Sequence, residues 1–203
     1  MALVKDIQLR EMASAYVVAS FDEGKKILEE AGYRIISLEE NARLRMQKGN
    51  DAYVSLNGNW VRENVIYVLN KGKYLTKKSP IIANAGQATN CHRNGKDFYL
   101  TDGQVEECLT DSVLLSLDKI PVNRFGDDDI TAYVFGEYAR EYGEFLGKAG
   151  ITEMPIWTTN TDLQDKSFVR PVWFCGLIDY FELNCYSRCL CTRYGVRGVK
   201  DSA

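Results

Sequence analysis

The chain has 203 residues and a net charge of −3, and its 45% hydrophobic and 26% charged residues are typical of a globular protein. No run of apolar residues approaches the roughly 18 that a membrane-spanning helix requires, so we expect no membrane partner. The segment from Met1 to Arg10 lacks the basic head and apolar centre of a secretory signal, which favours a cytoplasmic protein.

A chain of this length predicts a single compact domain over residues 1–203. Local patterns divide it into a helical part (1–50), a β-meander (51–100), and a long helix followed by strands (101–203). From Asn41 to Leu100 there are ten Lys or Arg residues against three Asp or Glu, whereas from Thr101 to Asp165 there are four against fourteen. This asymmetry indicates a basic face and an acidic face, unless the fold intermixes the two segments.

The first part of the chain is rich in helical signals. Ser37 and Glu40 have the spacing of a capping box, in which the two side chains bond each other's backbone N–H groups at a helix start. Gly32 is the expected stop of the helix before them. Helices are therefore predicted over Ile7–Val18, Asp22–Ala31 and Glu39–Lys48, with a short strand over Tyr33–Ser37.

Residues 51–82 change to strand and turn signals. The pair Asn57-Gly58 predicts a two-residue hairpin turn, because both residues tolerate positive φ angles. Asn70-Lys71-Gly72 predicts a second turn, and Pro80 ends the run because proline cannot donate a hydrogen bond to a sheet. The result is an antiparallel meander with strands predicted over Tyr53–Leu56, Trp60–Arg62, Val65–Leu69 and Tyr74–Thr76.

The second half contains the clearest helical pattern, over residues 127–149. Its apolar residues recur at spacings of three and four, which places them on one face: Ile130, Val134, Tyr138, Tyr142, Phe145 and Ala149. Asp127, Asp128 and Asp129 suit the helix start, where carboxylates cap free N–H groups, although adjacent carboxylates could also hold magnesium. Gly150 ends the helix.

Shorter elements surround this helix. Ala83–Gly95 has the composition of a loop, and Thr101 or Asp102 can cap a helix that follows it. Strand-like segments are Lys96–Leu100, Pro155–Thr158 and Val172–Leu183, and the end of the chain, Tyr194–Ala203, is predicted to be loose. Together these patterns predict an α+β fold, in which an antiparallel β-meander or sheet packs against helices and the helix over 127–149 is the central support.

The meander carries the preferred functional hypothesis. Its basic residues are interleaved with aromatic ones, a combination that can bind phosphates and stack on bases. The candidate ligand-binding residues are Trp60, Arg62, Tyr67, Lys71, Lys73, Lys77 and Lys78. We therefore predict a binding or regulatory protein that contacts an anionic partner, either nucleic acid or an acidic protein. The alternative reading of these lysines is that they protect a sheet edge from aggregation.

His92 carries the alternative hypothesis. It is the single histidine of the chain, so a mechanism that needs imidazole near neutral pH must use it. Cys91 could supply a thiolate nucleophile through a distant partner, and Asp97 and Asp102 are the nearby carboxylates. The alternative function is an enzyme that uses these residues on a phosphate-containing or other polar substrate.

The six cysteines are expected to be reduced, because a chain of this length does not need disulfides and shows no export signal. Cys185, Cys189 and Cys191 would share one face of a strand, which makes them candidates for binding a soft metal ion. The second pair of ligands of a typical zinc site is missing. The sequence therefore predicts no bound metal and no cofactor.

Overall fold

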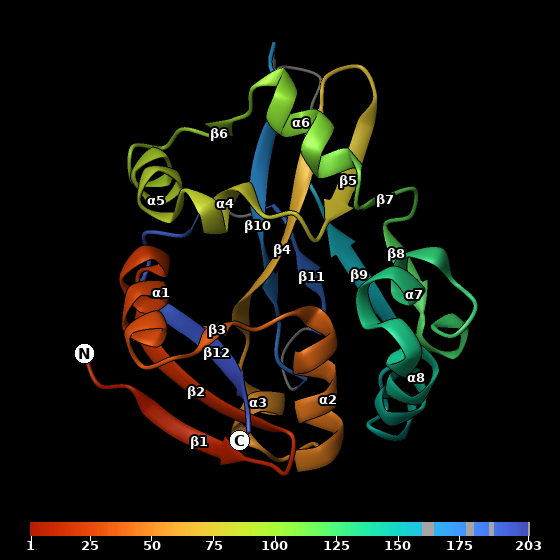
Figure 1. Ribbon diagram of the computed structural model, residues 1–203. Coiled ribbons are helices and arrows are strands. Elements are labelled where there is room, and N and C mark those ends of the chain that lie inside the picture. Colours follow the sequence, from red (N-terminus) through yellow and green to blue (C-terminus); the bar gives the residue numbers. More distant parts are fainter. Residues whose placement is uncertain (160–164, 178–180, 187–188, 203) are drawn as a thin grey trace.

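The computed structural model describes residues 1–159, 165–177, 181–186 and 189–202. Within these ranges, twelve strands join into one mixed sheet with helices around it (Figure 1). The strands are β1 (Val4–Gln8), β2 (Met12–Ala19), β3 (Arg34–Ile35), β4 (Asn59–Val68), β5 (Gly72–Thr76), β6 (Phe98–Tyr99), β7 (Ser112–Leu114), β8 (Lys119–Pro121), β9 (Glu153–Trp157), β10 (Phe168–Phe174), β11 (Leu183–Asn184) and β12 (Tyr194–Asp201). The α+β class is confirmed, but the sheet is not the purely antiparallel one that the sequence predicts.

The helices vary from single turns to three turns. They are α1 (Phe21–Glu30), α2 (Leu38–Lys48), α3 (Tyr53–Leu56), α4 (Pro80–Ala83), α5 (Ala85–Arg93), α6 (Asp102–Leu109), α7 (Asp129–Phe135) and α8 (Ala139–Lys148), with 3-10 turns η1 (Val122–Arg124) and η2 (Gly136–Tyr138). Across the described part of the chain, none of them has the length and hydropathy needed to cross a membrane.

The strand order brings the two ends of the chain together. The main path through the sheet is β1-β2-β12-β4-β10-β11-β9-β8. β12 pairs antiparallel with β2 along its whole length and parallel with β4 where Val196 meets Trp60. β9 and β11 form another parallel pair. The segment Tyr194–Ala203, predicted to be loose, therefore contributes a strand to the middle of the sheet.

The predicted helix over Ile7–Val18 is also wrong, because this segment forms β1 and β2. The moderately periodic spacing of Ile7, Met12, Ala15 and Tyr16 led to the helix prediction, and the alanines of β2 also favour helices in isolation. In the structure its small side chains fit between two neighbouring strands and beneath α1, where Ala15 and Val17 are fully buried. The pairing partner β12 lies at the other end of the sequence, so local periodicity could not show it.

Helices cover both faces of the sheet, and the central strand β4 is buried on both sides. Val65 and Tyr67 point into a cluster formed with α2, α3, α7 and α8. Trp60 and Ile66 point to the opposite side, into a cluster with α1, α4, α5 and α6. This alternation is the period of a strand whose two faces are both packed.

The long helix predicted over 127–149 is interrupted at Gly136, whose φ is 57°. Glycine adopts a positive φ at little cost, so the chain turns here from α7 through η2 into α8. The two helices lie at one side of the sheet (Figure 1) and are not its central support. Val134 and Tyr142 are fully buried as expected, whereas Tyr138 lies in the 3-10 turn and is half-buried.

The first half of the predicted meander differs from the structure. Tyr53–Leu56 forms the helix α3, and the N–H of Asn57 still bonds the carbonyl of Tyr53 at 3.0 Å. Asn57-Gly58 therefore joins a helix to β4, and the predicted hairpin there is wrong. The second turn is confirmed, since β4 and β5 pair in an antiparallel hairpin and Asn70 has a φ of 58°.

The helix starts chosen from local sequence signals are confirmed. Ser37 with Glu40, and Thr101 with Gln104, both form capping boxes. The segment Ala83–Gly95, predicted to be a loop, is helical instead. The buried face of α5 consists of Ala88, Thr89 and His92, so it shows no apolar periodicity.

Candidate functional site

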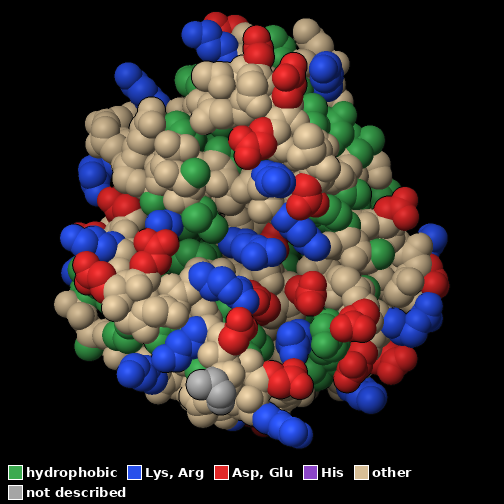
Figure 2. All heavy atoms as spheres, viewed as in Figure 1, with side chains coloured by type: hydrophobic (Ala, Val, Ile, Leu, Met, Phe, Trp, Pro, Cys, Tyr) green, Lys and Arg blue, Asp and Glu red, His purple; other side chains and the backbone are tan. Residues whose placement is uncertain are grey.

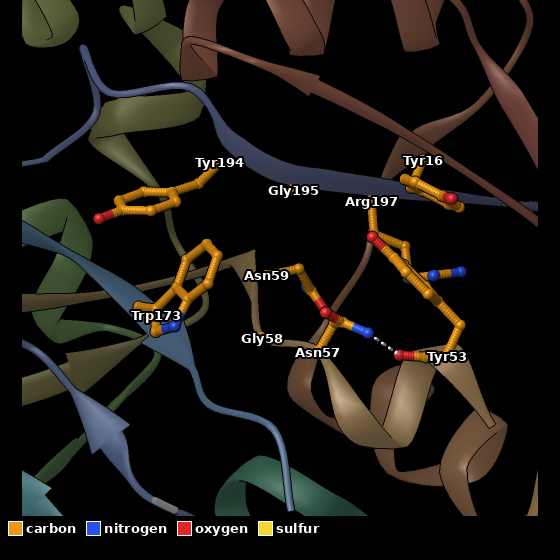
Figure 3. Close-up of a pocket in the computed structure, with 9 residues that line it drawn as sticks. All are labelled: Tyr16, Tyr53, Asn57, Gly58, Asn59, Trp173, Tyr194, Gly195 and Arg197. Carbon is orange, nitrogen blue, oxygen red and sulfur yellow. Dashed lines mark hydrogen bonds between the residues drawn. The ribbon is translucent and has the colours of Figure 1, made fainter. Parts of the chain in front are cut away.

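An aromatic pocket opens where the segment between α3 and β4 meets the ends of β10, β12 and β2 (Figure 3). Its volume is about 160 Å³. We use the name aromatic pocket for the cavity lined by Tyr16, Tyr53, Asn57, Gly58, Asn59, Trp173, Tyr194, Gly195 and Arg197. These residues come from both ends and the middle of the chain, and the sheet topology brings them together.

Two pairs of rings form opposite walls of the pocket (Figure 3). On one wall, the ring centroids of Trp173 and Tyr194 lie 5.1 Å apart. On the other, Tyr16 and Tyr53 stack at 4.6 Å with an angle of 19° between their planes. Tyr53 and Tyr194 are 45% and 44% exposed, so each presents ring surface to solvent. Aromatic rings combine an apolar body with a polar edge, and this suits them to binding surfaces.

Arg197 supports the second wall from behind. It is only 2% exposed, and its two Nη atoms donate to the two carboxylate oxygens of Asp6 at 2.9 and 2.8 Å. Nη1 also donates to Ser14 Oγ at 2.7 Å. The guanidinium carbon lies 5.2 Å from the centroid of Tyr16, so it holds that ring in place. Asp6 neutralises Arg197, the one charged residue of the described lining, so this part of the pocket is close to uncharged.

The floor of the pocket depends on glycine and amide groups. A Cβ atom at Gly58 would lie 2.6 Å from Trp173 Nε1, so the indole can occupy its position only beside a glycine. Gly195 comes close to the same segment, since a Cβ atom added at position 195 would lie 3.3 Å from the carbonyl oxygen of Gly58. Asn59 is buried, accepts from Asn41 Nδ2 at 2.7 Å and donates to the carbonyl of Trp60 at 2.9 Å.

Helix α3 places Tyr53 and Asn57 at the rim. Asn57 Nδ2 donates to the carbonyl of Tyr53 at 3.1 Å, which ties the two residues together (Figure 3). Burial, together with the nearby Tyr16, raises the pKa of Tyr53 above its ordinary value. Like any tyrosine hydroxyl at physiological pH, it is neutral and can donate a hydrogen bond.

The predicted aromatic face of the meander is part of the core. Trp60 and Tyr67 are each 1% exposed. Trp60 packs edge-on against Trp173 at 4.9 Å, and Tyr67 stacks on Phe168 at 4.5 Å and donates to the carbonyl of Cys185. Rings that are covered in this way cannot stack on the bases of a nucleic acid.

The basic residues of the meander do not form a separate positive surface. Arg62 Nε lies 3.9 Å from Glu63 Oε1, Lys73 Nζ donates to Thr158 Oγ1 at 2.8 Å, and the Lys77 ammonium lies 4.7 Å from the centroid of the Tyr133 ring. Lys71 and Lys78 are exposed. On the face that Figure 2 shows, Lys and Arg side chains are interspersed with Asp and Glu.

The four candidate catalytic residues lie in different surroundings. Cys91 and His92 are on α5, where His92 is only 4% exposed. Asp97 forms a buried ion pair with Arg170 Nε at 2.5 Å. Asp102 is the exposed first residue of α6. The Asp97–Arg170 pair anchors the segment before β6 to β10, a structural contact that the sequence did not indicate.

All six cysteines are free thiols. Cys185 is buried, and burial raises its pKa well above the ordinary range of a thiol. Cys189 and Cys191 are half-buried. The described residues contain no group of three or more His, Cys, Asp or Glu side chains that could hold a metal ion. The predicted absence of a metal remains a prediction.

Glu63 is a buried acid that sequence reasoning missed. Its side chain is fully buried in β4, and Oε2 accepts from the N–H of Leu38 at 3.0 Å. Burial raises its pKa from 4.5 to about 7, although the nearby Arg62 and the Leu38 N–H favour the charged form. This group therefore titrates close to neutral pH.

Sequence reasoning also missed most of the aromatic pocket. Trp173 lies in a run whose density of Trp, Phe, Tyr and Cys marked it as structured, and this density was the available signal. Tyr194 and Arg197 lie in the segment predicted to be loose. Tyr16 lies in the segment predicted to be a helix.

Comparison with known proteins gives a fold and no family. No model of a known protein family matches the chain, and no curated protein matches it. A solved structure described as "Accommodation of massive sequence variation in Nanoarchaeota by the C-type lectin fold" is similar, with a TM-score of 0.66 and 14% sequence identity over 97% of this chain and 100% of that chain. At this identity the similarity shows the fold alone, which is the C-type lectin fold.

This fold corrects the functional prediction. The strand β4, which carries Trp60 and Tyr67 of the predicted meander, is buried on both faces of a sheet with the C-type lectin fold, so both rings are core residues. The prediction of an anionic partner bound by this meander is therefore wrong. The alternative of an enzyme built on His92 and Cys91 has no support from the fold.

Proposed function

We propose that this chain is a recognition protein that binds an uncharged ring of a larger partner in the aromatic pocket. The observation that carries the proposal is the pair of opposed aromatic walls, Trp173–Tyr194 and Tyr16–Tyr53, on either side of a glycine and amide floor. Tyr, Trp, Asn and Gly are also the residues that dominate antibody binding sites. They provide rigid contact area and hydrogen bonds at low cost in conformational entropy.

The size of the pocket indicates what part of a ligand it takes. Sites that enclose whole small molecules have volumes of about 300–1,000 Å³. The aromatic pocket has about 160 Å³, which is enough for one ring or one side chain. The remaining contacts would come from the exposed rims formed by Tyr53, Asn57 and Tyr194. A single well-packed ring with such surroundings has the arrangement of an interface hot spot.

The charge of the pocket indicates an uncharged occupant. Among the lining residues that the structure describes, Arg197 is the single charged one, and both of its Nη atoms are held by Asp6. A charged group that enters would lose its hydration and find no unpaired opposite charge. A neutral ring loses little hydration free energy on entering, and it gains contacts with both walls.

The fold is consistent with a surface of this kind. The similar solved structure is described as a C-type lectin fold that accommodates massive sequence variation. In this chain the Arg197 end of the contact with Asp6 is buried, whereas Tyr53, Asn57 and Tyr194 are exposed. We propose that the exposed side chains determine the partner and can change without loss of the fold.

Three matched ring probes test the proposal: benzyl alcohol, benzoate and benzylammonium. We expect the neutral alcohol to bind better than both ions. Tyr53→Ala and Tyr194→Ala should each weaken its binding about three- to tenfold, because one aromatic contact is worth roughly 0.5–1.5 kcal/mol. Trp157→Ala is the control, since Trp157 is 56% exposed and lies outside the pocket. The proposal would be contradicted if either ion bound more strongly than benzyl alcohol, or if the two Tyr variants bound benzyl alcohol as well as the wild type does.

A further inference from the structure

A second and larger cavity lies between β5 and β9. Its volume is about 560 Å³, within the range of roughly 300–1,000 Å³ typical of small-molecule sites. We call it the β5–β9 groove. Lys73 lies on the β5 side, Trp157 and Thr158 lie at the end of β9, and Asp118 and Lys119 lie at the start of β8. It shares no lining residue with the aromatic pocket, so it is a separate site.

Hydrogen bonds hold the two sides of the groove together. Lys73 Nζ donates to Thr158 Oγ1 at 2.8 Å, and the N–H of Thr159 donates to the buried Tyr67 hydroxyl at 3.2 Å. Side chains alternate along β9, so Met154 and Ile156 are buried while Trp157 projects outward and is 56% exposed. The groove therefore has a fixed frame and one large exposed indole.

The charges in the groove are balanced but not all paired. Lys119 and Glu153 form an ion pair with each other at 2.9 Å. Among the described residues, Lys73 bonds the neutral Thr158 hydroxyl alone, so two of its three N–H donors have no described partner. The carboxylate of Asp118 makes no hydrogen bond or ion pair with any described residue. Lys73 and the exposed Asp118 thus line the same cavity and form no ion pair with each other.

We propose that the β5–β9 groove binds a free α-amino acid with a large apolar side chain. Lys73 would hold the carboxylate of the ligand, Asp118 would hold its ammonium group, and Trp157 would cover its side chain. A ligand with both charges satisfies both unpaired groups. A purely apolar ligand would leave Lys73 and Asp118 partly dehydrated and unpaired, and a singly charged ligand would satisfy one of them and face repulsion from the other.

The probe is L-phenylalanine, with binding followed by saturation-transfer NMR and calorimetry. Trp157→Ala should weaken binding about three- to tenfold, as expected for loss of one ring contact. Trp157→Phe should restore most of it, and Tyr194→Ala, in the aromatic pocket, should have no effect. These positions are exposed, so the variants should fold, which thermal melting will check.

Removing one charge from the ligand identifies its partner on the protein. N-acetyl-L-phenylalanine lacks the ammonium group, and L-phenylalaninamide lacks the carboxylate. The affinity of each should be at least about threefold lower than that of phenylalanine, because this is the contribution of one exposed charge pair. Asp118→Asn should weaken the binding of phenylalanine but not that of the N-acetyl compound. Lys73→Met should weaken the binding of phenylalanine but not that of the amide. Absence of binding to the wild type, equal binding of all three ligands, or loss of binding in Tyr194→Ala would overturn the proposal.

Discussion

Gly58 and the indole of Trp173 are in direct contact, and a Cβ atom at position 58 would lie 2.6 Å from Trp173 Nε1. The glycine therefore determines where one wall of the aromatic pocket stands. We expect Gly58→Ala to lower the free energy of unfolding by about 1–3 kcal/mol, the usual cost of adding a methyl group to a packed site. Denaturant unfolding measures this change.

Gly147→Ala is a suitable control for that experiment. Gly147 lies near the end of α8, and a Cβ atom there would meet no described atom within 4 Å beyond its chain neighbours and its own helix backbone. Alanine in a helix is more stable than glycine by roughly 0.5–1 kcal/mol, so this variant should be slightly stabilised. A Gly58→Ala protein as stable as the wild type would mean that Trp173 is not held against the chain at this point.

The contact between Asp6 and Arg197 joins the first strand to the last and should be important for stability. Asp6→Ala leaves the buried guanidinium without its counter-charge, and breaking a buried pair in this way costs roughly 3–5 kcal/mol. Since Asp6 is 16% exposed at its side chain, we expect the lower end of that range. The neighbouring Lys5→Ala is the control, because Lys5 is exposed and should change stability by less than about 0.5 kcal/mol.

Glu63 should make stability depend on pH. Its pKa is about 7 in the folded protein against 4.5 for the free side chain, so the folded state binds this proton more tightly. Its stabilising contribution is fully present below pH 4.5 and is lost as the pH rises through 7. Relative to Glu63→Gln, the free energy of unfolding of the wild type should fall by up to about 3 kcal/mol as the pH rises across this window.

Unfolding free energies of both proteins, measured from acid to mildly alkaline pH, test this expectation. The difference between them isolates Glu63 from the other titrating groups. A difference that does not change with pH would show that the carboxyl group titrates normally in the fold.

Local features of this fold could be predicted from the sequence, and long-range ones could not. The capping box of Ser37 with Glu40 and the turn at Asn70 depend on residues within a few positions of each other, and both were predicted. β2 and β12 exist because they pair with each other across the length of the chain. Gly136 shows another limit, because nothing in its local pattern distinguishes a break from a glycine tolerated within a helix.

The same limit applies to the candidate site. Tyr16, Tyr53, Trp173 and Tyr194 meet only once the sheet is assembled, and each is unremarkable in its own segment. The predicted residues Trp60 and Tyr67 belong to a β-prone run that is buried on both faces. Alternation of aromatic and basic residues suggested an exposed face there, because the helices that cover it lie elsewhere in the sequence.

The most direct test of the proposed function follows the indole N–H signals of the three tryptophans by NMR while benzyl alcohol is added. Trp173 forms a wall of the aromatic pocket, Trp60 lies behind it, and Trp157 lies in the separate β5–β9 groove. We expect the Trp173 signal to move most, the Trp60 signal to move less and the Trp157 signal to stay in place. Movement of Trp157 alone, or of none of the three, would contradict binding of a neutral ring in the aromatic pocket.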